Sequence, residues 1–279
     1  MKMSIKNIML HADNSAAFGA RLDYAIEFSL ANNAHLTALY VVPNYPVPAY
    51  VGMPMDPGVV QQNNDYEWDE AKKMQQQFEK TIQASGCEYE WRIEEGDTVR
   101  LLNLHGRYFD LIILGQNDPD RNSMYHISIT GDLVVGLGRP CLVLPFEGTV
   151  FRPAKRILVA WNGSHTAARA LNDAMPLLEA AEVVEVITIN PEKTSLAEGD
   201  LAPADICLHL ARHGVKAVAT GHHSKGVDKG ELLLTQASQM AADLLVTGAY
   251  GHSRVREFIL GGVTRHLLNN MSLPVFMSH

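Results

Sequence analysis

Two apolar segments with nearly the same layout lie in the two halves of this chain, and they constrain its fold more than any other feature. Asp110-Leu-Ile-Ile-Leu-Gly115 and Asp243-Leu-Leu-Val-Thr-Gly248 each lead from an acidic residue through a β-prone run to a glycine. Lys6–Ser15 and Lys155–Ser164 repeat one another in the same way. Self-similarity of this kind indicates that one structural unit is used twice.

Each copy alternates short apolar runs with helix-like segments. In the second copy, a single helix is expected over Ala167–Ala181. In the first copy, Ile8–Leu10 and Leu36–Val42 are strand candidates on either side of a helical segment. This β-α-β order predicts parallel strands joined by a right-handed crossover. We therefore expect two α/β domains, residues 1–148 and 153–279, each of a size normal for a single domain. The boundary is expected in Phe146–Pro153, a connector that contains glycine and proline.

One stretch interrupts this alternation. Pro43–Trp68 is rich in proline and then becomes polar, and a helix is expected only after it, over Asp69–Ser85. Loops of such length are seldom structureless without a role. We expect a surface excursion that covers a site or contacts a partner, with an insertion that has no function as the alternative.

The composition excludes several classes of protein. The 279 residues are 47% apolar and 19% charged, with a net charge of −8, which disfavours non-specific binding to nucleic acid or to an anionic membrane. The three cysteines are far apart, and the N-terminal segment is too polar for a signal peptide or a membrane span. We expect a cytoplasmic protein that binds neither nucleic acid nor membrane.

The end of the chain carries the most informative motif. After the strand candidate that ends at Gly248 come Gly251, then Gly261–Gly262, and then Thr264 at the start of an amphipathic helical segment. Small residues in a loop that leads into a helix N-terminus let main-chain N–H groups approach a phosphate. The alternative is that these glycines only make a turn and a helix–strand contact.

The expected topology predicts where a ligand would bind. In open parallel sheets, ligands bind beyond the carboxyl ends of the strands, where the strand order reverses. For a flavodoxin-like order, that point lies between the first and fourth strands, which in the second half end at Trp161–Ser164 and Gly248–Gly251. The end of the second strand, at Ile189, offers backbone groups to a base.

The repeated layout and the segment GAYGHSRVREFILGGVT resemble the universal stress protein family in its tandem two-domain form. The resemblance implies an α/β protein of two tandem flavodoxin-like (adenine nucleotide alpha hydrolase-like) domains. Each would have a five-stranded, mostly parallel sheet with helices on both faces. Many members of the family bind ATP through G-x2-G-x9-G-[S/T], and Gly248, Gly251 and Gly261 fall on the three motif glycines.

Two departures from the family pattern bear on the ligand. Gly262 stands where the family usually has Ser or Thr, which removes a hydroxyl donor, and Thr264 is expected to compensate in part. Asn162 stands where the family often has an acid, so the charge that would help hold Mg²⁺ is missing. We expect ATP or another adenine nucleotide as the ligand, and Mg²⁺ remains an open, disfavoured alternative.

The first half departs further from the motif. Gly115 is retained, but Asp118 takes the place of the second glycine, and Asp118 and Asp120 would repel phosphate. Asp13 keeps the acid of the first strand. We expect this half to be mainly structural, or to bind something other than ATP in the same place.

The predicted nucleotide-binding residues lie at three strand ends and along the glycine-rich segment: Ala160, Trp161, Asn162, Ile189, Gly248, Gly251, His252, Arg254, Gly261, Gly262, Val263 and Thr264. For His252 and Arg254 the alternative to a phosphate contact is a solvated loop position. Trp161 either walls the base pocket or packs in the core.

Catalytic motifs are absent from the sequence. It contains no G-x4-G-K-[S/T] P-loop and no G-x-S-x-G nucleophile elbow, and His222-His223 has no Cys or carboxylate cluster nearby. We expect no catalytic residue, no metal site and at most slow ATP hydrolysis. The favoured function is a regulatory or sensing role in the stress response; the rivals are a nucleotide-dependent enzyme and a nucleotide-free interaction scaffold.

The resemblance also implies how the halves associate. Cys141–Leu144 and Val275–Met277 are expected to pair edge to edge, which would make the chain an intrachain pseudo-dimer and cover two sheet edges. Further homodimerisation and an unidentified protein partner stay open.

Overall fold

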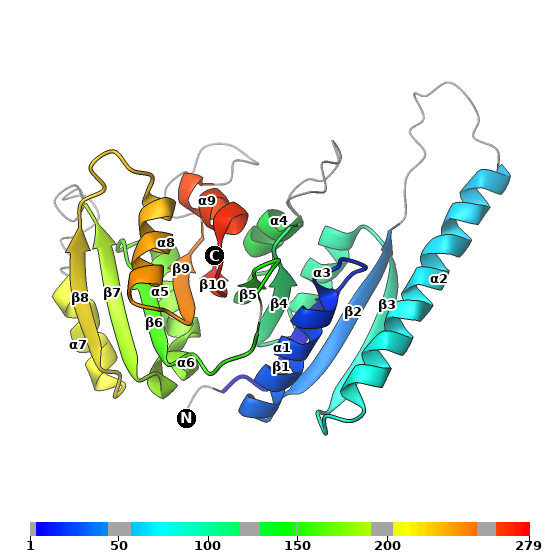
Figure 1. Cartoon of the computed structure of the whole chain (residues 1–279), viewed down its shortest axis with the longest axis horizontal. Helices are drawn as coiled ribbons and strands as arrows, with labels where there is room; N and C mark the ends of the chain where they lie inside the picture. The colour runs from blue at the N-terminus through cyan, green and yellow to red at the C-terminus, as the bar shows by residue number, and fades with distance from the viewer. Residues whose placement is uncertain (1–3, 44–56, 118–128, 149, 191–202, 250–260) are drawn as a thin grey trace.

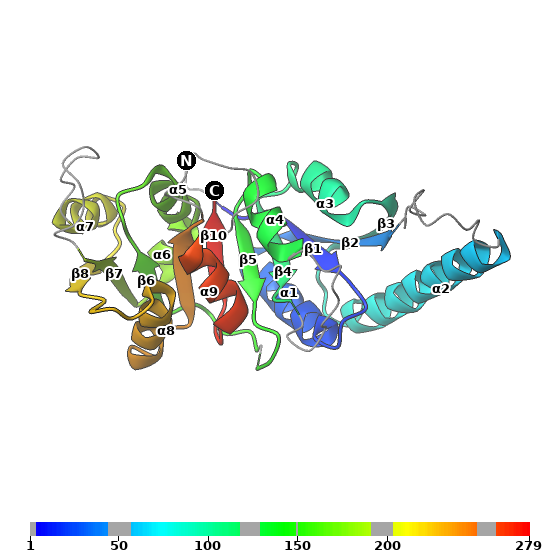
Figure 2. The same ribbon diagram turned by 90° about the horizontal axis from the view of Figure 1, so that it is seen from above.

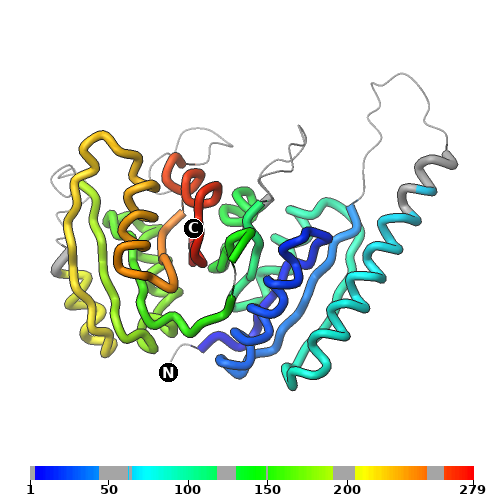
Figure 3. The backbone as a smooth tube through the Cα atoms, in the orientation of Figure 1, coloured from blue at the N-terminus to red at the C-terminus, as the bar shows by residue number. Residues whose placement is uncertain are grey.

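The computed structural model of the chain describes residues 4–43, 57–117, 129–148, 150–190, 203–249 and 261–279, and Figure 3 draws the remaining residues in grey. The described strands form one continuous ten-stranded sheet in the order β3-β2-β1-β4-β5-β10-β9-β6-β7-β8. Figure 1 shows the two halves side by side along this sheet, with the last strands of both in the middle.

The first half supplies five of these strands and four helices. In chain order its elements are β1 (Asn7–Ala12), α1 (Phe18–Asn32), β2 (His35–Pro43), α2 (Pro57–Ile82), β3 (Tyr89–Gly96), α3 (Thr98–Gly106), β4 (Leu111–Gly115), α4 (Ile129–Gly136) and β5 (Cys141–Leu144).

The second half repeats the plan with one helix more. Its elements are β6 (Arg156–Ala160), α5 (His165–Asp173), α6 (Met175–Ala180), β7 (Val183–Ile189), α7 (Pro203–Arg212), β8 (Ala217–His222), α8 (Lys229–Gln239), β9 (Leu244–Gly248), α9 (Gly262–Asn270) and β10 (Val275–Ser278).

Strand order is the same in both halves. Reading each from its outer edge, the third strand is followed by the second, first, fourth and fifth, and all pairs within a half are parallel. This is the doubly wound order 3-2-1-4-5, in which the first and fourth strands meet where the order reverses, as expected. The predicted fold class is therefore confirmed.

The repeated acidic residue before the fourth strand has a structural role. Asp110 Oδ2 accepts hydrogen bonds from the main-chain N–H groups of Lys6 and Asn7, at 2.8 and 3.0 Å. Asp243 Oδ2 accepts from Lys155 and Arg156 at 3.0 and 2.9 Å. In each half this carboxylate fixes the start of the first strand beside the start of the fourth.

The two halves join through their last strands, as predicted. β5 and β10 pair antiparallel, with Val143, Leu142 and Cys141 opposite Val275, Phe276 and Met277. The side chains in this register are buried on both faces of the sheet. The halves therefore share one continuous sheet with a core on each face, and neither final strand presents an open edge at the junction.

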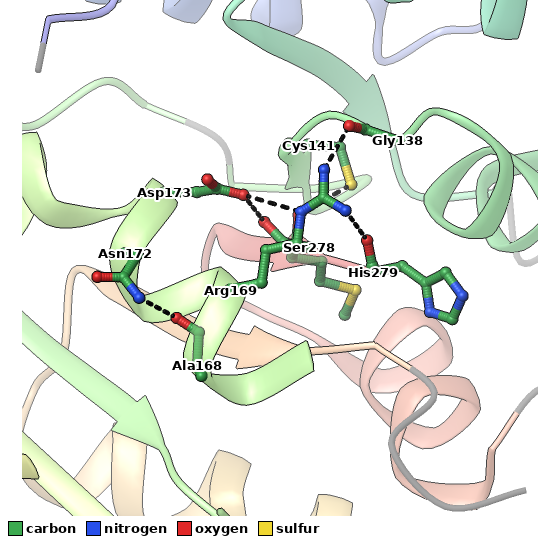
Figure 4. Close-up of polar contacts among 9 residues, drawn as sticks. Gly138, Cys141, Ala168, Arg169, Asn172, Asp173, Ser278 and His279 are labelled. Carbon is green, nitrogen blue, oxygen red and sulfur yellow. Dashed lines mark hydrogen bonds and ion pairs between the residues drawn. The ribbon is translucent and has the colours of Figure 1, made fainter. Parts of the chain in front are cut away.

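Arg169 of α5 strengthens this junction, as Figure 4 shows. Its guanidinium donates to the main-chain oxygens of His279 at 2.8 Å and Gly138 at 2.6 Å. Asp173, one turn further along α5, accepts from Ser278 Oγ at 2.9 Å. One helix of the second half thus holds both the end of β10 and the turn that leads into β5 of the first half.

Helices cover both faces of the sheet, as the view from above shows (Figure 2). One core lies between the sheet and helices α1, α2, α5, α6 and α7. The other lies between the opposite face and helices α3, α4, α8 and α9. Successive β1 residues alternate between them, with Ile8 and Leu10 in the first core and Met9 in the second, as the pleat of a strand covered on both faces requires.

Two predictions about helices were wrong. Helix α2 begins at Pro57, not near Asp69, so residues 57–68 of the expected excursion are helical. The reason is that proline is tolerated in the first turn of a helix, where its missing N–H has no intrahelical partner. The single helix expected over Ala167–Ala181 is two, because α5 ends at Asp173 and α6 starts afresh with Pro176 in its first turn.

No helix among the described residues is long and apolar enough to cross a membrane.

Candidate functional site

A pocket of about 270 Å³ lies at the carboxyl ends of β6 and β9. These are the first and fourth strands of the second half, and their pairing ends at Ala160 opposite Thr247. The pocket therefore occupies the position where strand order reverses, which is where the fold predicts a ligand.

Each predicted nucleotide-binding residue that the structure describes lines this pocket: Ala160, Trp161, Asn162, Ile189, Gly248, Gly261, Gly262, Val263 and Thr264. The fold brings together three strand ends and the first turn of α9, from residues as far apart in the sequence as Ala160 and Thr264. Gly251, His252 and Arg254 lie outside the described residues, so their predicted role remains a prediction.

Four further residues line the pocket that the sequence did not single out: Ala167, Lys229, Leu233 and Thr247. Ala167 belongs to the first turn of α5, and Lys229 and Leu233 to the first turns of α8. The signal that would have found them is topological, because helices that follow neighbouring parallel strands begin at the same edge of the sheet as the strand ends.

Gly248 brings β9 against α5 more closely than any other residue would allow. A Cβ atom at this position would lie 2.5 Å from the main-chain nitrogen of Ala167 and 2.5 Å from the carbonyl carbon of Thr166. These neighbours are backbone atoms, which cannot rotate aside as a side chain can. The glycine is therefore required for the packing of the strand end on the helix that forms one wall of the pocket.

Helices α5, α8 and α9 all begin at this pocket, and they differ in how their first turns are capped. Ser164 caps α5, its hydroxyl accepting from the N–H of Ala167 at 3.2 Å. Asp228 caps α8, accepting from the N–H groups of Gly230 and Glu231 at 2.8 and 3.3 Å. The N-cap of α9 is Gly261, and within the described part of the chain no side chain caps its first turn.

The first turn of α9 is thus the place where an external acceptor fits. Gly261 has φ −56° and ψ 141°, the extended conformation typical of an N-cap. At Gly261 and at Gly262, no atom of the described residues beyond the adjoining backbone lies within 4 Å of the position a Cβ would take. Within the same residues, the first main-chain N–H groups at the positive end of the helix dipole have no side-chain cap, an arrangement that favours an anion.

The described residues that line the pocket carry positive charge only. Lys229 carries the one formal charge there, and none of these residues is an acid. The side chain of Asn162 makes local hydrogen bonds: its amide oxygen accepts from the N–H and from the hydroxyl of Ser164, at 3.1 and 2.7 Å. The described residues contain no group of three or more His, Cys, Asp or Glu side chains able to hold a metal ion.

The corresponding place in the first half is built differently. Arg21 of α1 is 3% exposed, and its Nη2 lies 2.7 Å from Asp13 Oδ2, just beyond the end of β1. His11 Nδ1 lies 3.9 Å from the same carboxylate oxygen. Against burial, which would raise it, Arg21 and His11 hold the pKa of Asp13 well below its usual range. Asp118 and Asp120, predicted to repel phosphate here, lie outside the described residues.

Acid is expected to destabilise the fold through His11. Burial lowers the pKa of His11 from 6.5 to about 4, against the attraction of Asp13 and with a smaller contribution from Arg21. The unfolded chain therefore takes up this proton as pH falls through about 6.5, and the folded chain only near 4. Between about pH 7 and about pH 4.5 this single group removes about 2 kcal/mol of folding free energy.

Urea unfolding of the wild type and of His11→Gln across this range measures the effect. The variant should have a flatter pH dependence than the wild type. Parallel curves for the two proteins would show that His11 is not responsible.

Fold and site together define the class of this protein: it is an α/β protein of two tandem flavodoxin-like repeats, with a pocket at the switch point of the second. A family model described as the universal stress protein family matches residues 153–279. Universal stress protein Slr1230 of Synechocystis sp. is 25% identical over 293 aligned positions, covering 97% of this chain and 99% of that protein.

Solved structures show the same fold. A universal stress protein from Archaeoglobus fulgidus DSM 4304 aligns with 99% of this chain and 96% of its own, with a TM-score of 0.77 at 17% identity. A putative universal stress protein from Pseudomonas aeruginosa UCBPP-PA14 aligns with 98% and 93%, with a TM-score of 0.57 at 14% identity. Residues 153–279 match the universal stress protein family, as the sequence predicted, and the whole chain has the fold of these solved structures.

Proposed function

We propose that this protein binds an adenine nucleotide in its second half and acts as a sensor or regulator in the stress response. The observation that carries the proposal is the uncapped first turn of α9, which opens into the pocket at the switch point of the sheet. The match of residues 153–279 to the universal stress protein family supports the regulatory role. The two halves act, in this proposal, as separate domains, residues 1–148 and 153–279.

The inner part of the pocket suits a base and a sugar. Its walls carry apolar side chains from three directions, namely Ile189 at the end of β7, Val263 of α9 and Leu233 of α8. The volume of about 270 Å³ is near the lower end of the range for small-molecule sites, ~300 Å³. The base would lie between these walls, and the phosphates would extend along Gly261–Thr264.

Isothermal titration with ATP, ADP and AMP tests the proposal, with GTP as a control for the base. We expect saturable binding of the adenine nucleotides and weaker binding of GTP. No saturable heat with any nucleotide would leave the scaffold as the function. Turnover of bound ATP separates a sensor from an enzyme: slow hydrolysis is expected, and a rate of several per second would favour the enzyme.

Lys229 is expected to strengthen binding of the anionic ligand. It is exposed, and it is the charged residue among the described pocket lining. An exposed cation near a phosphate contributes up to about 1 kcal/mol, so Lys229→Gln should weaken ATP binding by about fivefold. The affinity of the variant should also depend less on salt, because one screened attraction has been removed.

Lys225→Gln is the matched control. Lys225 lies in the connection between β8 and α8, four residues before Lys229, and is exposed, but it is not part of the pocket lining. The control removes the same charge from a nearby position and should leave affinity within about twofold of the wild type. Equal losses in both variants would mean that Lys229 acts only through the general charge of the surface.

A further inference from the structure

The two halves differ at the position where their folds are equivalent. Gly115 ends β4 as Gly248 ends β9, and Asp13 follows β1 as Asn162 follows β6. Both glycines therefore stand at a switch point, beside the first strand of their half. The atoms that surround Gly115 and Gly248 differ, and this difference bears on whether the first half can hold a ligand.

At Gly248 the space beside the strand end is closed by a helix backbone. The three heavy atoms nearest to the position of a Cβ belong to the main chain of Thr166 and Ala167. At Gly115 the three nearest atoms all belong to the side chain of Arg21, and a Cβ would collide with Arg21 Nη1. The first half thus places a guanidinium against its strand end where the second half places a helix turn.

Arg21 reaches this position from the helix that follows β1. Counting onward from Asp13 and Asn162 pairs the buried Leu22 with the buried Leu171, and sets Arg21 against Ala170. A long side chain on the first turns of a helix points back towards the helix N-terminus, here towards the strand ends. The second half has a methyl group at the same point and leaves its pocket free.

The guanidinium is held there by geometry and charge. Its carbon lies 5.6 Å from the centre of the Phe18 ring, and Nη2 lies 2.7 Å from the Asp13 carboxylate. Arg21 is 3% exposed, and among the described residues its buried Nε has no hydrogen-bond acceptor. The guanidinium is therefore buried beside a partly exposed counter-ion, since the Asp13 side chain is 31% exposed, and Arg21 is not a solvated surface arginine.

We propose that Arg21 is the built-in occupant of the first-half site, so that the chain binds one nucleotide and not two. The stoichiometry of one nucleotide per chain rests on the proposed function. The placement of the Arg21 guanidinium in the first-half site does not depend on it. Two effects exclude a phosphate from the first half. The guanidinium lies against both Gly115 and Asp13, whose equivalents Gly248 and Asn162 line the pocket of the second half, and Asp13 cancels its charge. Arg21 is thereby the residue that determines which half accepts the ligand.

Chemical rescue tests the internal site directly. Arg21→Ala should lower the melting temperature by several degrees, because it leaves a cavity with an unpaired carboxylate. Methylguanidinium chloride, at concentrations far below those that denature, should restore part of that loss and reach saturation, whereas sodium chloride at equal ionic strength should not. Rescue should vanish in Arg21→Ala/Asp13→Asn. Absence of rescue in the single variant would overturn the proposal.

Arg92→Ala is the control for loss of an arginine. Arg92 pairs with Glu90 at 2.8 Å on the surface, with 39% of its side chain exposed, and its variant should show no rescue. If Arg21→Ala folds only when methylguanidinium is present, the refolding yield replaces the melting temperature and supports the proposal equally. If it folds under neither condition, the labelling of the wild type decides.

Photolabelling of the wild type with 8-azido-ATP locates the bound nucleotide. We expect labelled peptides only from residues 153–279 and one nucleotide per chain. Labelled peptides from residues 1–148, or two nucleotides per chain, would overturn the proposal. No labelling anywhere would contradict the proposed function instead, and rescue would then decide the internal site by itself.

Discussion

Replacing Gly248 by alanine is expected to cost about 3 kcal/mol of folding free energy, which is more than the addition of one methyl group usually costs. The added Cβ would lie 2.5 Å from two backbone atoms of the first turn of α5, so β9 or the helix has to move. Residues of both elements line the pocket, so ATP affinity should fall together with folding stability. Urea unfolding and titration of the same variant measure the two effects.

Gly261→Ala is the control for this variant. It adds the same methyl group to the same pocket, but among the described residues no atom beyond the adjoining backbone lies within 4 Å of the new carbon. Its φ of −56° is accessible to every L-residue. Folding free energy should stay within about 0.5 kcal/mol of the wild type. Equal costs for both variants would show that the close approach of β9 to α5 is wrong.

Gly261→Asp is expected to raise the folding stability of the protein and to weaken its binding of ATP. Gly261 is the N-cap of α9 and has the backbone conformation that a capping aspartate adopts. A carboxylate there would accept hydrogen bonds from the first turn and interact favourably with the helix dipole, adding up to about 1 kcal/mol of stability. The same carboxylate would take the N–H groups proposed for phosphate and repel it, lowering ATP affinity by about a hundredfold.

Gly261→Asn isolates the charge in this experiment. Asparagine caps a helix about as well as aspartate, without the negative charge. Its affinity loss should be intermediate, from competition for the N–H groups alone. Should Gly261→Asp bind ATP as tightly as the wild type while the protein is stabilised, the phosphates do not lie at α9.

The sequence was sufficient for the fold because its signals were short-range. Apolar runs that end at a glycine, such as those before Gly115 and Gly248, mark parallel strands buried on both faces. The order of strands and helices then leaves few topologies. The pocket residues Gly248, Gly261 and Thr264 could be named for the same reason: the switch point collects strand ends and helix starts, whatever the details of packing.

What the sequence did not predict depends on distances between segments that are remote in the chain. Lys229 looks like any surface lysine until α8 is placed beside β9. Arg21 sits in an amphipathic helix where an arginine is expected to be solvated, and its burial becomes visible only with Asp13 and Gly115 in place. The start of α2 at Pro57 was missed because proline also marks loops.

Amide hydrogen exchange, measured with and without saturating ATP, tests the central claim most directly. If the main-chain N–H groups at the start of α9 hold the phosphates, exchange at Gly262, Val263 and Thr264 should slow markedly on binding. Protection should extend to Ala160–Asn162 at the end of β6, and the end of β4 should be unchanged. Bound ATP that leaves the first turn of α9 exchanging at its free rate would contradict the account.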